Sequence, residues 1–161
     1  MTPRRAQSET RWRGIAAAPG VAVGHAYVYR VAHHEPPLRK LGPRDDPEAE
    51  FQRLEDALAE VRADLERMQH SSKGFVGSAM DKIFDAQLLI IADETLRTDS
   101  RALITDKRLN AESAFWRVVT ESQDAIRRSS DPFLREMANE IQTVKRRVLN
   151  RLLGLPDMPK V

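Results

Sequence analysis

The stretch PEAEFQRLEDALAEVRADLERMQH, residues 47–70, decides the fold class of this 161-residue chain. Its large apolar side chains recur at spacings of 3, 4, 3, 4 and 3 residues and are Phe51, Leu54, Leu58, Val61, Leu65 and Met68. Such a stripe lies along one side of a helix and is typical of an antiparallel bundle or a coiled-coil seam. Asp46, Pro47 and Glu48 supply a capping carboxylate, a proline at the first helical position and an acid near the positive helix end. We therefore predict a long helix that begins at residue 47.

Four more helices are predicted after a break that contains Ser71, Ser72, Gly74 and Gly77. The second begins near residue 78 and runs through IFDAQLLII at 83–91, and its apolar side chains nearly encircle it. Caps and breakers for the others are Asp93 before the third, Asn110 before the fourth, Asp131-Pro132 before the fifth and Gly154 after it. Their apolar residues are Leu96, Leu103 and Ile104, then Phe115, Val118, Val119 and Ile126, then Phe133, Met137, Ile141, Val144, Val148 and Leu152. Helices with short connections predict an antiparallel bundle.

The segment before the bundle has a different composition. Residues 14–30, GIAAAPGVAVGHAYVYR, read as two short strands around a turn, and two strands alone are marginal in water. Proline and glycine recur in residues 31–46, which suits a linker. We predict a flexible basic arm at 1–13, a strand pair at 14–30, a linker at 31–46, a helical domain at 47–155 and a tail at 156–161.

Composition excludes several classes of function. The chain has no cysteine, so disulfides, thiolate catalysis and cysteine-bound zinc are ruled out. No apolar run approaches the roughly 20 residues that span a bilayer, and no secretory signal follows the basic start, so we expect a cytoplasmic protein without a membrane partner. The net charge is only +2, and outside a basic cluster at 145–151 the charge signs are mixed, so no nucleic-acid partner is predicted.

No catalytic or metal site can be argued from the residues. The four histidines, His25, His33, His34 and His70, lack metal-ligand spacing, and no phosphate-binding glycine motif is present. Asp93 and Glu94 stand at a helix start, where capping explains them. We predict a binding module without a cofactor of its own. The apolar residues at 80–90 are either core of the bundle, which the residues alone favour, or a surface for a partner.

Two motifs resemble a known family. GIAAAPGVAVGHA at 14–26 resembles the opening strand and turn of enzyme I, the phosphoenolpyruvate-protein phosphotransferase of the bacterial sugar phosphotransferase system. IFDAQLLIIADE at 83–94 resembles the family's I-F-E-[AG]-H-x-x-[ML]-L-x-D segment, and a run at 106–118 and the ending KRRVLNRLLGL follow in the family's order. The resemblance covers about 14–155. It implies a mostly α fold: a helical HPr-binding domain preceded by a short β-hairpin that belongs to an incomplete α/β phosphohistidine domain.

The resemblance also implies a site for HPr, the small phosphocarrier protein. The apolar interface candidates are Ile83, Phe84, Leu88, Leu89 and Ile90, with Ile126 and Phe133 on adjoining helices. The acidic neighbours are Asp85, Asp93 and Glu94, and Gln87 stands where the family usually has histidine. An apolar centre with a charged rim suits a transient protein contact. Met137, Gln142 and Thr143 replace charged residues that are usual in the last helix.

Enzyme I accepts phosphate on a histidine within a G-G-x-T-S-H segment and binds phosphoenolpyruvate and magnesium in a carboxy-terminal barrel. This chain contains no such segment. We therefore expect it to position a carrier without phosphorylating it unaided, to work with the remainder of enzyme I, and to depend on Mg²⁺ only in the full-length enzyme. Two alternatives stay open: a freestanding helical regulatory adaptor without phosphotransfer, and a helical dimerisation module that uses the 51–68 seam.

Overall fold

The described residues form five helices. The computed structural model describes residues 36–72 and 78–156, and before them 11, 13, 14, 19–21 and 23–25; side chains at 72, 78–80 and 132–136 are not described. The helices are α1 (Pro47–Ser72), α2 (Ser78–Ile91), α3 (Glu94–Lys107), α4 (Ala111–Arg127) and α5 (Pro132–Leu152). The predicted mostly α fold is confirmed. The strand pair predicted at 14–30 falls largely outside the described residues and stays a prediction.

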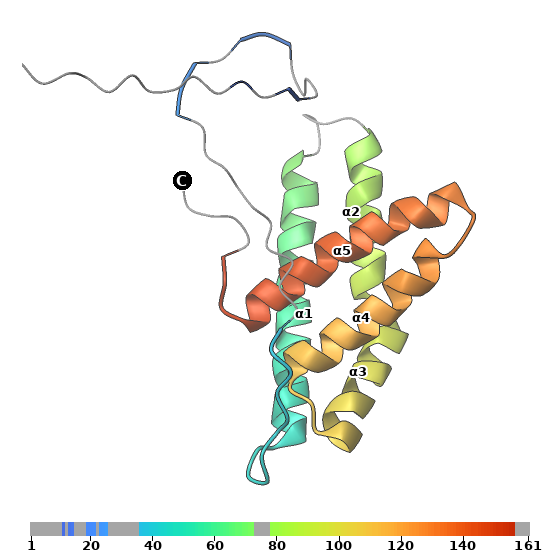
Figure 1. Ribbon diagram of the computed structural model, residues 1–161. Coiled ribbons are helices and arrows are strands. Elements are labelled where there is room, and N and C mark those ends of the chain that lie inside the picture. Colours follow the sequence, from blue (N-terminus) through green and yellow to red (C-terminus); the bar gives the residue numbers. More distant parts are fainter. Residues whose placement is uncertain are drawn as a thin grey trace, which may run out of the picture. The chain divides into compact units, whose positions relative to one another are not determined.

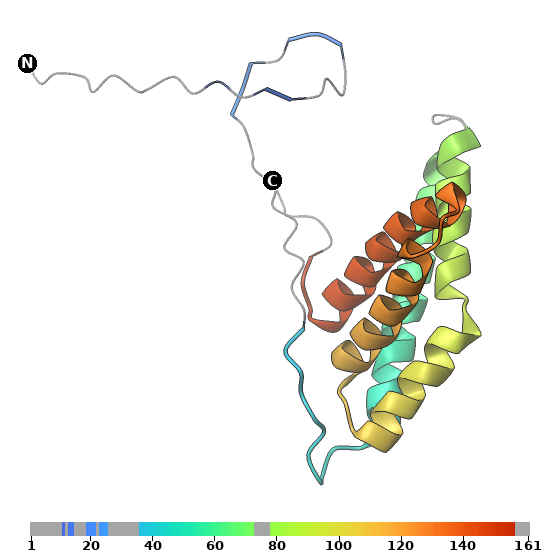
Figure 2. The same cartoon turned by 45° about the vertical axis from the view of Figure 1, so that its right-hand side comes forward.

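The helices belong to one compact unit. The chain divides into the units Met1–Ala32 and His33–Val161, and all five helices lie in the second. In that unit α2 and α3 follow each other along α1, while α4 and α5 lie side by side and cross α1 obliquely (Figures 1 and 2). As a result α2 packs against α1 and α5, and α3 packs against α1 and α4.

Local capping signals set most of the helix ends. The Asp46 carboxylate accepts a hydrogen bond from the Glu48 amide at 3.0 Å, and the Asp93 carboxylate accepts one from the Thr95 amide at 2.9 Å, as predicted. Gly154, with φ of 66°, follows the end of α5, and the next amide, that of Leu155, donates to the carbonyl of Asn150 at 2.8 Å.

The start of α4 differs from the prediction. Asn110 stands at the N-cap, but its side chain makes no capping bond and donates instead to Glu112 at 2.6 Å. A carboxylate from another helix caps the first turn instead: Glu50 of α1 accepts a hydrogen bond from the Ala111 amide at 2.7 Å. The expectation that the Asn110 side chain caps this helix is therefore wrong.

The 51–68 seam forms the centre of the core. Its four inner residues, Leu54, Leu58, Val61 and Leu65, are buried, whereas Phe51 is half-buried and Met68 is exposed. They pack in one cluster with buried residues of the other helices, among them Ile91, Ile104, Phe115, Val119, Val144 and Val148. A dimerisation module would need this seam on the surface, and the unit buries it within itself.

The stretch predicted as a linker is tied to the bundle over residues 36–46. Lys40 forms a β-bridge with Leu109, the Leu41 amide donates to the Arg108 carbonyl at 2.6 Å, and Leu41 is buried. The Arg108 guanidinium donates in turn to the carbonyls of Leu41, Gly42 and Asp45. These residues therefore form part of the helical unit.

Candidate functional site

The outer face of α2 presents apolar side chains to solvent. Leu89 is 69% exposed and Ile83 is 37% exposed, and the charged residues Lys82 and Asp85 of the same helix are exposed too. The helix packs against α1 and α5, and the side turned away from these two helices stays open. An exposed leucine on a helix whose opposite side enters the core is a candidate contact residue for a partner.

The other apolar candidates on α2 lie deeper. Phe84, Leu88 and Ile90 are half-buried and pack against the central core. Most of the apolar excess of α2 therefore belongs to the bundle, as the residues alone favoured, while Ile83 and Leu89 form the open part. Ile126, at the end of α4, is also half-buried against the core, and the side chain of Phe133 lies outside the described residues.

Gln87 has a structural role. It is buried, and its side-chain amide donates to the Glu140 carboxylate of α5 at 2.6 Å. This bond joins α2 to α5 across the bundle. Gln87 therefore lies between helices and not on the open face.

Acidic side chains border the open face. Asp85 accepts a hydrogen bond from Gln69 of α1 at 2.8 Å, and Asp93 and Glu94 are exposed where α2 gives way to α3. Asp93 is fixed by its capping bond to the start of α3. Of the predicted residues, the structure thus brings Ile83, Leu89, Asp85, Asp93 and Glu94 to the surface.

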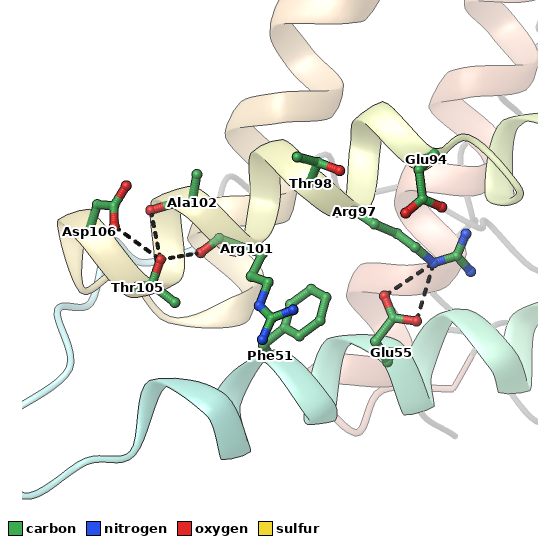
Figure 3. Close-up of a pocket in the computed structure, with 9 residues that line it drawn as sticks. All are labelled: Phe51, Glu55, Glu94, Arg97, Thr98, Arg101, Ala102, Thr105 and Asp106. Atoms are coloured by element: carbon green, nitrogen blue, oxygen red, sulfur yellow. Dashed lines mark hydrogen bonds and ion pairs between the residues drawn. The ribbon is translucent and has the colours of Figure 1, made fainter.

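A hollow of about 570 Å³ lies between α1 and α3 (Figure 3). Its two arginines are occupied: Arg97 pairs with Glu55 at 3.1 Å, and Arg101 pairs with Glu48 at 2.8 Å. The Arg101 guanidinium also lies 5.0 Å from the centre of the Phe51 ring. Because both cations are already matched by carboxylates, the hollow offers an anionic ligand little unpaired positive charge. These ion pairs could not be predicted from the sequence, in which the four residues appear only as polar positions of two separate helices, α1 and α3.

Sequence reasoning also missed an ionic cluster that joins three helices. The Arg53 guanidinium of α1 lies 2.7 Å from both Glu50 and Glu112 and donates to the Leu152 carbonyl at 3.1 Å. Burial raises the pKa of Glu50, but the hydrogen bonds from Arg53 and the Ala111 amide outweigh this effect and hold it below its usual 4.5. The cluster fixes the starts of α1 and α4 and the end of α5.

The described residues offer binding surfaces and no cluster for metal chemistry. No group of three or more His, Asp or Glu side chains among them could hold a metal ion. No helix in the described part of the chain has the length and apolar character needed to cross a membrane.

Comparison with known sequences identifies the family. The family description "PEP-utilising enzyme, N-terminal" matches residues 13–137, more than half of the chain. The chain is 31% identical over 147 residues to the phosphoenolpyruvate-protein phosphotransferase of Lactococcus lactis subsp. lactis, covering 91% of this chain and 25% of the relative. It is 32% identical over 145 residues to the protein of the same name from Enterococcus faecalis, covering 89% and 24%. The chain thus spans about a quarter of the length of these curated relatives.

Two solved structures share the fold. One, titled "NMR solution structure of Enzyme I (nEIt) protein using two 4D-spectra", matches with a TM-score of 0.66 at 24% identity, covering 73% of this chain and 47% of that one. The other, "N-terminal domain of Enzyme 1 - Nitrogen", matches with a TM-score of 0.67 at 25% identity, covering 76% and 50%. The resemblance of the two sequence motifs to enzyme I is therefore confirmed, and the chain belongs to the family of N-terminal domains of PEP-utilising enzymes.

Proposed function

We propose that the helical unit docks an HPr-like phosphocarrier on the outer face of α2, as the N-terminal part of a phosphoenolpyruvate-protein phosphotransferase. The observation that carries this proposal is the exposure of Leu89, 69%, on a helix whose opposite side is built into the core. Ile83 extends the apolar surface, and Asp85, Asp93 and Glu94 supply negative charge around it. The motif that contains these residues, 83–94, is the one that resembles the carrier-binding segment of enzyme I.

The two parts of this surface have different physical roles. Burial of Leu89 and Ile83 against an apolar patch of the carrier supplies most of the affinity, at roughly 25 cal/mol for each Å² of apolar surface removed from water. The exposed carboxylates attract a basic carrier and raise its association rate, an effect that salt screens. Together they suit a complex that must form and dissociate during each phosphoryl relay.

The transfer itself is assigned to the rest of the protein. We propose that a phosphohistidine domain, to which residues 14–30 would belong, and a phosphoenolpyruvate-binding barrel with Mg²⁺ complete the enzyme in the cytoplasm. A neutral histidine ring nitrogen is nucleophilic, and the phosphoryl group it accepts is reactive enough to pass on. In this scheme the helical unit contributes position: it holds the carrier where that histidine can reach it.

Titration with HPr from the same cell tests the docking. Backbone amide shifts of the labelled chain should move at 83–94 as carrier is added, because these amides lie at or beside the proposed contact. Unchanged shifts in this segment at saturating protein concentration would refute the proposal.

A charge placed at the centre of the surface should abolish the contact. We expect Leu89→Asp to weaken carrier binding at least about tenfold, because it puts a carboxylate into the apolar contact. Leu38→Asp is the matched control, since Leu38 is 74% exposed but lies in the 36–46 segment away from α2. Calorimetric affinities and the circular dichroism of both variants provide the measurement. Equal affinities for the two variants would contradict the assignment of α2.

A further inference from the structure

A second hollow lies among the 36–40 segment, the end of α3 and the first half of α4. Its volume is about 580 Å³, and its apolar lining includes Leu103, Leu109 and Trp116. Leu38, 74% exposed, stands among its lining residues. Pockets that bind ligands are concave and mostly apolar, with a few polar groups that fix the orientation of the ligand. None of the α2 surface residues lines this hollow.

The lining carries an excess of positive charge. Lys40 and Lys107 line the hollow, and neither forms an ion pair with any residue that the structure describes. The third cation, Arg117, is paired with Glu121 at 3.0 Å, so these two charges cancel. Two ammonium groups without an ion-pair partner among the described residues therefore stand beside an apolar floor.

A buried ammonium group adds positive charge behind the wall of the hollow. Lys145 of α5 is 3% exposed, and its Nζ lies 4.3 Å from the centre of the Trp116 ring and 3.3 Å from Thr120 Oγ1. Trp116 and Thr120 both line the hollow, so this amine lies behind its wall. Its closest polar partner is the neutral Gln123 Oε1, at 3.0 Å. Burial, followed by repulsion from Arg127, lowers the pKa of Lys145, and attraction by Asp124 offsets only part of this effect.

The hollow continues along the groove between α3 and α4. A smaller depression of about 320 Å³ shares Leu103, Lys107 and Arg117 with it, but Asp99 and Asp106 also line that depression. The excess of positive charge is therefore confined to the first hollow, and an acidic segment is expected to lie there and not in the smaller depression. A basic segment would meet like charges at Lys40 and Lys107, whereas an acidic one would neutralise them.

We propose that this hollow is a second docking site, which takes a short acidic segment of a partner protein: an apolar side chain packs on Leu103 and Trp116 while flanking carboxylates pair with Lys40 and Lys107. The site is distinct from the carrier surface on α2, since the two share no residue. The segment gains apolar burial from the floor and specificity from the charges.

Selection from a displayed library of random short peptides tests the proposal on the whole chain. The expected result is enrichment of peptides that carry Asp or Glu next to Leu, Phe or Trp, and synthetic versions should shift the amides of residues 103–121. Enrichment of basic peptides, or no enrichment, would overturn it. So would binding of a small aromatic sulfonate dye in the hollow without any selected peptide, since that result would assign the hollow to small organic anions.

Charge reversal locates the contact. We expect Lys107→Glu to weaken a selected acidic peptide at least about tenfold and to improve binding of its lysine-substituted counterpart. Lys82→Glu, an exposed lysine on α2, is the matched control and should leave the peptide affinity unchanged. Equal effects of the two reversals would indicate general attraction by net charge and would refute the site. Leu38→Asp should weaken the peptide, and Leu89→Asp should not, so failure here is distinguishable from failure of the carrier surface.

Discussion

Glu50 stands on α1 and completes the first turn of α4. Its carboxylate accepts a hydrogen bond from the Ala111 amide at 2.7 Å and pairs with Arg53 at 2.7 Å. The first amides of a helix have no partner within the helix, and the side chain that should have capped α4, that of Asn110, is turned to Glu112. The Glu50 carboxylate thus accepts a hydrogen bond from the first amide of α4 and also pairs with the Arg53 guanidinium.

We expect Glu50→Gln to lower the free energy of unfolding by about 1–3 kcal/mol, because a neutral amide cannot match the charge of Arg53. The pKa of Glu50 lies below its usual 4.5 in the fold, so its contribution is fully present above pH 4.5 and is lost as pH falls through the lowered folded value. Wild type should therefore lose more stability than Glu50→Gln on acidification from pH 5. Urea unfolding at a series of pH values measures this difference.

Glu48→Gln provides the control for that effect. Glu48 also pairs with an arginine, Arg101, at 2.8 Å, but both side chains are exposed. Exposed pairs contribute little, so this substitution should change stability by less than about 1 kcal/mol. If Glu50→Gln and Glu48→Gln lowered the free energy of unfolding equally, the position of Glu50 in the ionic cluster would have no importance.

At the scale of the helices, sequence signals worked where they were local. Helix ends are marked by Asp46-Pro47, Asp93 and Gly154, because each cap and the amides or carbonyls near it are neighbours in the chain. The start of α5 at Pro132 also agrees with the Asp131-Pro132 signal. The bond from Gln87 to Glu140 joins residues 53 positions apart, and the bond from Ala111 to Glu50 joins residues 61 apart. No periodicity in a single helix contains that information, so the cross-links of α2 and α4 could not be predicted.

The burial pattern of the 51–68 seam predicts that truncating a side chain costs more stability in the middle of α1 than near its end. Leu58 is fully buried, so Leu58→Ala should lower the free energy of unfolding by about 2–5 kcal/mol through lost burial and a cavity. Met68 belongs to the same stripe but is exposed, and Met68→Ala should cost less than about 1 kcal/mol. Thermal and denaturant unfolding of both variants distinguishes them. A large loss at Met68 would contradict this difference between the middle and the end of α1.

At the scale of the whole molecule, the helical unit is self-contained. It begins at His33 and includes the 36–46 stretch. We expect a fragment of residues 33–161 to unfold cooperatively and to keep the carrier affinity of the whole chain. A fragment of 47–161 should be less stable, since it lacks buried Leu41 and the carbonyls that Arg108 binds. Circular dichroism melts measure both, and a fragment 33–161 without a cooperative transition would contradict this expectation.

The two proposed surfaces differed in how far the sequence could predict them. Residues 83–94 are contiguous, so a motif could indicate the α2 surface, although the division between exposed Leu89 and half-buried Phe84 required the packing of the bundle. The second hollow combines residues from 36–40, 103–109 and 113–121 with a lysine of α5 behind it. Only the fold brings these segments together.

Arg108 joins two opposing requirements at one position. Its backbone is left-handed, with φ of 51°, which costs an L-residue roughly 1–2 kcal/mol and which glycine would adopt freely. Its guanidinium, however, binds three carbonyls of the 41–45 turn, and glycine would release all three. A glycine at position 108 would relieve the backbone but leave the 41–45 turn without the side chain that holds it. A change at position 108 is therefore tolerated only if another residue takes over the hydrogen bonds to the turn.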